Sequence, residues 1–242
     1  MAEQERLEID GEITPAEAVS DLSSHDWVVD GVVLQFRADG TVTCTWPAPY
    51  VIADARRRGE ALLRAYLVES DIYGDITFGS VAREFTASGG SIIISPPAAA
   101  ARITMGRPSI LIGGVRVGPN PESTAWLAAL LLSDDAVYEA SVFLQASQRA
   151  SGNRTRDDRL AFEVMEHSLG GDGGRNALRT LASLTEKEMK DLGNWLQVGS
   201  HETVTERGLS VRPGFDAANV HGLVHKIFLA WARDRADRSA DE

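Results

Sequence analysis

Histidine is the residue type whose spacing in this chain could support metal binding or catalysis. His221 and His225 lie one helical turn apart, so their rings share one face of a helix, as two zinc ligands must. His201 is the most obvious third ligand. The zinc-peptidase pattern also requires a glutamate directly after the first histidine, and Gly222 occupies that position. Both histidines flank the apolar stripe of their helix, where half-exposed polar residues are usual, so we expect no metal ion and no cofactor.

Other motifs that could carry chemistry are incomplete. The glycine run "LGGDGGRN" precedes a helix, where backbone amides can hold a phosphate. Phosphate-binding loops, however, follow a strand and carry a lysine and a serine or threonine that this run lacks. There is no G-x-S-x-G nucleophile motif. Cys44 falls in a predicted hairpin as a small core residue. The carboxylate pairs Asp134–Asp135 and Asp157–Asp158 begin predicted helices, where they complement the helix dipole. We therefore expect no catalytic residue from these motifs.

Composition excludes several classes of protein. The chain has 242 residues, 43% hydrophobic and 24% charged, which is typical of a globular protein. Its net charge is −11 and both halves are acidic, so nucleic-acid binding is not expected. The single cysteine excludes an internal disulfide. The N-terminus lacks a secretion signal and no apolar run approaches the ~20 residues of a membrane span, so we expect a soluble, cytoplasmic protein away from membranes. The 21 arginines against 3 lysines are typical of GC-rich bacterial coding.

The first half of the chain has the patterning of a β-rich α+β domain, residues 1–119. Apolar residues alternate from Trp27 to Trp46 around an Asp-Gly turn, which predicts a β-hairpin. We expect its solvent-exposed face to carry Thr41, Thr43 and Thr45. Residues 1–24 are acidic and polar, and we expect them to be frayed, with a short helix over 15–22. A helix is predicted over 51–68. The spacing over 75–90 fits a helix or a strand, and we favour the helix; a buried strand at 91–95 and short strands up to residue 119 follow.

The second half, residues 120–242, is predicted to be a helical bundle that begins after the boundary "GPNPES". We predict a capping box formed by Thr185 and Glu188, and helix caps at Ser133 and Asp216. The tail from Asp234 onward is predicted to be disordered. The predicted helices cover residues 122–132, 134–150, 156–169, 175–184, 186–197 and 216–235.

The helical half resembles HEPN-type domains in its layout. In "GNWLQVGSH" a histidine follows a helix end, and a loop and a final apolar helix come after it. That family includes ribonucleases of toxin and abortive-infection systems, whose active members carry R-x(4–6)-H, and inactive binding relatives. Asn194 and His201 fit the corresponding places, but Gly193 stands where the arginine would be. The resemblance over residues 121–236 therefore implies a degenerate member.

The absence of a complete catalytic motif in the sequence favours a binding protein. We expect a non-catalytic binding or regulatory protein of a bacterial cell, in a defence or stress system, whose partner is another protein or a second copy of the chain. The alternative is a HEPN-like ribonuclease centred on His201, with Asn194 beside it as the second candidate.

Overall fold

The structure is a computed structural model that describes residues 5–16, 19, 26–72, 74–86, 91–94, 121–148, 154–170, 173–197 and 216–241. It confirms the α+β class, with a sheet in the first part of the chain and helices after it. The chain divides into two compact units, Met1–Leu132 and Ser133–Glu242. The domain boundary predicted at residue 119 lies outside the described residues. Helix α2 (Pro121–Ser133) falls almost entirely in the first unit, where Thr124 Oγ1 donates a 2.6 Å hydrogen bond to Glu69.

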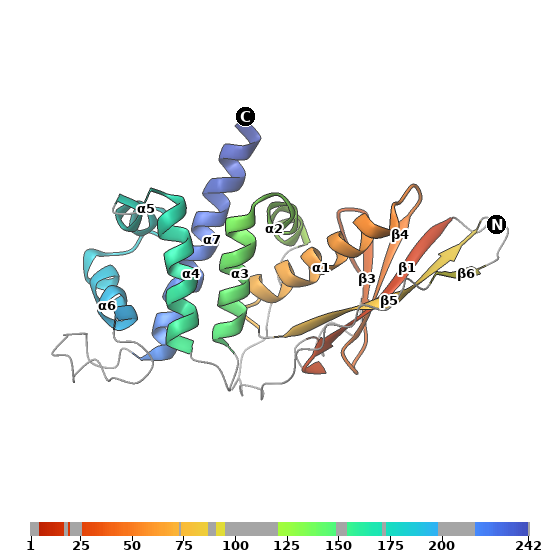
Figure 1. The fold of residues 1–242 in the computed structure, drawn as a ribbon, viewed down its shortest axis with the longest axis horizontal. Coiled ribbons are helices and arrows are strands. Elements are labelled where there is room, and N and C mark those ends of the chain that lie inside the picture. Colours follow the sequence, from red (N-terminus) through yellow and green to blue (C-terminus); the bar gives the residue numbers. More distant parts are fainter. Residues whose placement is uncertain are drawn as a thin grey trace. The chain divides into compact units, whose positions relative to one another are not determined.

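The first unit contains a six-stranded sheet in the order β2-β3-β4-β1-β5-β6 (Figure 1). Every neighbouring pair is antiparallel. The strands are β1 (Arg6–Thr14), β2 (Asp26–Val29), β3 (Val32–Phe36), β4 (Thr41–Pro47), β5 (Asp75–Phe85) and β6 (Ser91–Ile94). Helix α1 (Ile52–Glu69) confirms the predicted helix, and its Tyr66 contacts Phe36 of the sheet, with ring centroids 5.7 Å apart.

The prediction that the N-terminal residues are frayed is wrong for β1, which lies inside the sheet between β4 and β5. Leu7, Ile9 and Ile13 are at most 1% exposed. They alternate with Glu8 and Asp10, which lie on the other face. The charged residues lower the average hydrophobicity of this segment and conceal its two-residue period. Most of the short helix predicted over 15–22 lies outside the described residues.

The predicted hairpin is confirmed by β3 and β4, in which Leu34 pairs with Cys44 and Gly40 forms part of the turn with a φ of +86°. A second hairpin joins β2 to β3. Asp30 and Gly31 form its turn with φ values of +50° and +75°, the combination that a two-residue type I′ turn requires.

The prediction that Thr43 lies on the solvent-exposed face of the hairpin is wrong, because this residue is only 4% exposed. Thr43 Oγ1 donates a 2.7 Å hydrogen bond to Asp10 on β1, and Arg83 Nη2 donates a 2.7 Å hydrogen bond to the other oxygen of that carboxylate. The neighbouring strand therefore covers the threonine with polar groups. Thr41 and Thr45 are half-buried.

The helix predicted over residues 75–90 is wrong, because Asp75–Phe85 form strand β5. Its register with β1 is irregular. Phe78 and Ala82, four residues apart, pair with Gly11 and Ile9, which are only two residues apart. A β-bulge of this kind places apolar residues at a spacing that also fits a helix, which explains why the sequence pattern was ambiguous. The predicted strand at 91–95 is confirmed as β6; the short strands predicted after it lie outside the described residues.

The second unit is built from α3 (Asp135–Ser147), α4 (Arg154–Ser168), α5 (Gly174–Leu181), α6 (Glu186–Gln197) and α7 (Ala217–Asp241). Helix α7 contacts all four of the others (Figure 1). Its Trp231 and Phe228 are completely buried, as are Met165 of α4, Leu178 of α5 and Leu192 of α6. None of the helices in the described part of the chain has the length and apolar character needed to cross a membrane.

The helix ends agree with the predicted caps at two of three positions. Thr185 and Glu188 form the capping box through reciprocal hydrogen bonds, and Asp216 accepts from the backbone N–H of Asn219. The cap of α3 is Asp134, not Ser133. Its carboxylate accepts from the backbone N–H groups of Ala136 and Val137, which a carboxylate does better than a hydroxyl because it also complements the helix dipole.

The disordered tail that was predicted from Asp234 onward is also wrong, because α7 continues to Asp241. Charged side chains one turn apart form ion pairs there, between Arg233 and Asp237 and between Arg238 and Asp234. Such i,i+4 pairs stabilise exposed helices, although each contributes only a few tenths of a kcal/mol, about 0.3–0.5.

Candidate functional site

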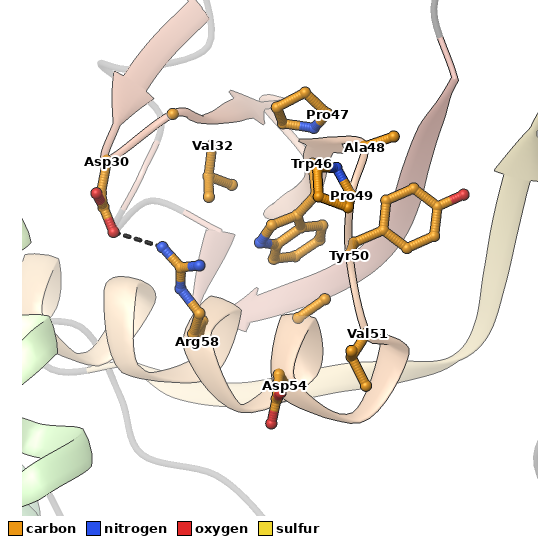
Figure 2. Close-up of a pocket in the computed structure, with 12 residues that line it drawn as sticks. Asp30, Val32, Trp46, Pro47, Ala48, Pro49, Tyr50, Val51, Asp54 and Arg58 are labelled. Atoms are coloured by element: carbon orange, nitrogen blue, oxygen red, sulfur yellow. Dashed lines mark hydrogen bonds and ion pairs between the residues drawn. The ribbon is translucent and has the colours of Figure 1, made fainter.

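A pocket of about 510 Å³ lies in the first unit, between the β2–β3 turn, the end of β4 and the first turns of α1 (Figure 2). This volume is within the range of small-molecule sites, roughly 300–1,000 Å³. The wall is mainly apolar, and the charged residues Asp30, Asp54 and Arg58 complete it. The apolar lining residues include Val32, Trp46, Pro47, Ala48, Pro49, Val51 and Ala55.

Trp46 lines this pocket with a buried indole ring. Trp46 is 4% exposed, and its indole Nε1–H has no hydrogen-bond partner among the described residues. The indole nitrogen can only donate, and leaving a buried donor unpaired costs about 1–3 kcal/mol. The ring packs edge-to-face against Phe78, with centroids 6.5 Å apart.

An ion pair between Arg58 and Asp30 lies at the rim of the pocket. It joins α1 to the β2–β3 turn, and Figure 2 shows the indole nitrogen of Trp46 on the side where this pair lies. The side chains are 41% and 63% exposed, so the pair contributes little to stability. Its consequence is local: Arg58, the one guanidinium among the described lining residues, already has a carboxylate partner.

The segment from Trp46 to Val51 carries two prolines and connects β4 to α1. Tyr50 anchors it: its hydroxyl donates a 2.7 Å hydrogen bond to Glu84 of β5, and Figure 2 shows that hydroxyl turned away from the pocket. Burial, and then the bond to Glu84, raise the pKa of Tyr50 to about 12. Sequence reasoning treated Trp46 only as a core residue. The signal for a site was the proline-rich connection that follows it.

The second unit holds a buried polar cluster around His221, which is 4% exposed rather than half-exposed as predicted. Its Nδ1 lies 2.8 Å from Asp158 Oδ1 and 2.9 Å from Ser147 Oγ, and its Nε2 lies 2.9 Å from Gln148 Nε2. With Nδ1 protonated, its single N–H is shared between Asp158 and Ser147, and Nε2 accepts from the Gln148 amide. The cluster joins α4 and α7 to the end of α3.

The composition Ser-His-Asp invites comparison with a hydrolase triad, but the geometry differs. In a triad the serine and the aspartate bind opposite ring nitrogens, whereas Ser147 and Asp158 both lie against Nδ1. Ser147 is completely buried and donates a 2.8 Å hydrogen bond to the carbonyl of Leu144. It therefore has neither the base nor the access that a nucleophile needs. Asp158 is also fully buried, so complementing the helix dipole, as predicted, does not account for it.

The predicted metal ligands are only partly described. His225 is half-buried and stacks on His221, with ring centroids 6.3 Å apart and planes 16° apart. Both nitrogens of His221 already have protein partners. His201 lies outside the described residues, and within the described residues no three His, Cys, Asp or Glu side chains form a metal-binding group.

Asn194, the other ribonuclease candidate, is half-buried on α6. The adjacent Gly193 lines a second pocket, of about 420 Å³, against α4 and α5. Two ion pairs occupy its wall, Arg175 with Glu166 at 3.2 Å and Arg159 with Glu163 at 2.7 Å. The four charged residues of this lining are thus paired with one another.

Comparison of the chain with family models, with curated proteins and with solved structures finds no match. The assignment of a function therefore depends on the geometry of the two units. Of the sites described above, the Trp46 pocket combines an open volume with a mainly apolar wall.

Proposed function

We propose that this protein is a non-catalytic binding protein whose ligand, a small organic molecule, occupies the Trp46 pocket. The observation that carries the proposal is an open volume of about 510 Å³ with a mainly apolar wall. This wall would supply affinity through burial of the ligand's surface, at about 25 cal/mol per Å² before the costs of association.

Binding is favoured over catalysis by the residue types that line the pocket. None of the described lining residues is a serine, cysteine, histidine or lysine. Asp30 is paired with Arg58, and Asp54 is exposed on the first turn of α1. Tyr50 is held by Glu84. These side chains form no nucleophile–base pair of the kind that covalent or acid–base catalysis requires.

The proposal extends to a regulatory role in a bacterial defence or stress system, in which the occupied protein binds a second protein or another copy of the chain. Tyr138 and Val142 support this part of the proposal. They lie one turn apart on α3 and are 42% and 36% exposed, so they present apolar surface to a partner.

Nuclear magnetic resonance on ¹⁵N-labelled protein tests ligand binding directly. Small organic fragments should shift the indole N–H signal of Trp46, which is assigned by its loss in Trp46→Phe. Trp27→Phe is the matched control, because Trp27 is half-buried in a separate contact with Tyr66 and does not line the pocket. Ligands should bind this control as they bind the wild type. If no fragment of a broad set moves the Trp46 signal, the proposal is wrong.

The alternative proposal is a HEPN-like ribonuclease, supported by the layout of a histidine after α6 and a final helix α7. Purified protein is incubated with RNA, with His201→Ala and Asn194→Ala as the variants. Cleavage by the wild type that His201→Ala abolishes would favour the ribonuclease. An equal lack of cleavage in all three proteins removes it.

A further inference from the structure

The second pocket, of about 420 Å³, has a wall unlike that of the Trp46 pocket. It lies within the second unit, and half of its described lining residues are charged, two arginines and two glutamates. These four side chains are between 20% and 49% exposed, so a molecule in the pocket can reach their polar atoms. A small polar molecule suits this wall, because an apolar one would take the charged groups out of water without replacing their hydrogen bonds.

Each arginine uses only part of its hydrogen-bonding capacity within the protein. Arg159 donates from Nε to Glu163 at 2.7 Å, and Arg175 approaches Glu166 through Nε at 3.2 Å. A guanidinium has five N–H groups, so the Nη1 and Nη2 groups of both arginines have no hydrogen bond within the described part of the chain. This fork is the part of an arginine that binds a carboxylate through two parallel hydrogen bonds.

The guanidinium of Arg175 is positioned by α4 and α6. It lies over the ring of Phe162, 5.6 Å from the ring centroid, and Phe162 is only 2% exposed. A Cβ atom added at Gly193 would lie 3.5 Å from Nη1 of Arg175, so this nitrogen lies beside the bare backbone of α6. The lack of a side chain at Gly193 leaves room beside the fork, and both residues line the pocket.

The glutamates leave acceptor atoms in the same pocket. Their contacts with the arginines involve Oε1 of Glu163 and Oε1 of Glu166, and no described residue binds either Oε2 atom. An ionised carboxylate can only accept, so a group that binds here must donate. Leu196 and Gln197 belong to the last turn of α6, where the helix dipole places partial negative charge. An ammonium group, a cation with three donors, fits these acceptors.

The donors and acceptors of the pocket are balanced in charge, with two positive and two negative side chains. A ligand that is only an anion would bind an arginine fork but leave the glutamates without a donor, and a ligand that is only a cation would do the reverse. We infer that this pocket binds a zwitterion of the amino-acid class. Its carboxylate accepts from the Nη groups of Arg175, and its ammonium group donates to Glu163 and Glu166. This site is separate from the Trp46 pocket and goes beyond the proposed function.

Nuclear magnetic resonance on ¹⁵N-labelled protein tests this inference through the backbone amide of Gly193 and the Nε–H of Arg175. The common amino acids are titrated one at a time, and the best binder should shift both signals in a saturable way. It is then compared with its amide, which lacks the carboxylate, and with its N-acetyl derivative, which lacks the ammonium group. Each derivative should bind about tenfold more weakly, because it loses one set of charge-assisted hydrogen bonds.

Two variants locate the site, and a melting curve of each shows that it is folded. Arg175→Gln should weaken binding about tenfold. Its matched control is Arg238→Gln, which removes an arginine of α7 that does not line the pocket and should bind as the wild type does. Gly193→Ala adds a methyl group at ordinary contact distance from Nη1 of Arg175, so it should keep the fold and weaken binding about three- to tenfold.

The possible results separate the ligand class from the site. An amide or N-acetyl derivative that binds as tightly as the amino acid overturns the zwitterion. Binding that is unchanged in Arg175→Gln, or absent for every amino acid at millimolar concentrations, overturns the site. The Trp46 indole signal is not used here, so the proposed function stands or fails by its own test.

Discussion

The ring of Phe78 on β5 lies directly against the Cα of Gly59 in the middle of α1. A Cβ atom at Gly59 would overlap the ring, and a Cβ atom at Gly11 on β1 would come within 3.0 Å of it. Phe78 thus occupies a space that two glycines keep open, and it packs in turn against Trp46. The position of the pocket's tryptophan depends on this packing, although Gly59 costs the helix about 1 kcal/mol relative to alanine.

Substitution of Gly59 by alanine should destabilise the protein, contrary to helix propensity. Overpacking against Phe78 should lower the free energy of unfolding by about 1–3 kcal/mol. The matched control is Gly222→Ala on α7, because the added Cβ would meet no described atom within 4 Å apart from its neighbours and its own helix backbone, and it should stabilise the protein by about 0.5–1 kcal/mol. Urea denaturation of both variants measures the two values. A gain in stability in Gly59→Ala would contradict the packing.

The cluster around His221 should prove structural. His221→Ala leaves Asp158 buried without its partner and creates a cavity, so it should lower the free energy of unfolding by about 2–4 kcal/mol. His225→Ala, at a half-buried position one turn away, should cost less than about 1 kcal/mol. A chelator should leave the melting temperature of the wild type unchanged, because both ring nitrogens of His221 bind protein atoms. A clear drop in that temperature would instead indicate a metal ligand set.

The hydrogen bond from Tyr50 to Glu84 should make stability depend on pH in the alkaline range. Folding raises the pKa of Tyr50 from 10.0 to about 12, so the neutral phenol is favoured in the folded state. This contribution is fully present below pH 10 and is lost as the pH rises through about 12. The difference in unfolding free energy between wild type and Tyr50→Phe should shrink over that window. A difference that stays constant would show that the phenol does not titrate as stated.

The thiol of Cys44 should be unreactive in the folded protein. Cys44 is completely buried in β4, opposite Ile9 and Leu34, and burial raises the pKa of its thiol well above the usual range. Iodoacetamide at mildly alkaline pH should therefore modify the folded protein very slowly, and modification should become rapid once denaturant is added. Mass spectrometry measures both rates. Equally fast modification in both conditions would show that the sheet opens readily at β4.

Sequence patterns correctly predicted the features that depend on residues close together in the chain. The alternation around Gly40 predicted the β3–β4 hairpin, and the spacing of Thr185 and Glu188 predicted a helix start. Both depend on contacts within a few residues, which a sequence displays directly. The helix cap at Asp216 was predicted for the same reason, because its contact is also local.

The sequence by itself therefore determined the α+β order, the hairpin and most helices. Only the tertiary structure decided that β1 and β5 pair inside the sheet. Ile9 and Ala82 are far apart in the chain, so their pairing depends on which strands form hydrogen bonds with each other in the folded protein. The tertiary structure likewise decided that His221 lies against Asp158, which is 63 positions away in the chain. Trp46 Nε1, which has no partner among the described residues, is a further case, since whether a buried donor finds an acceptor depends on what the whole fold places beside it.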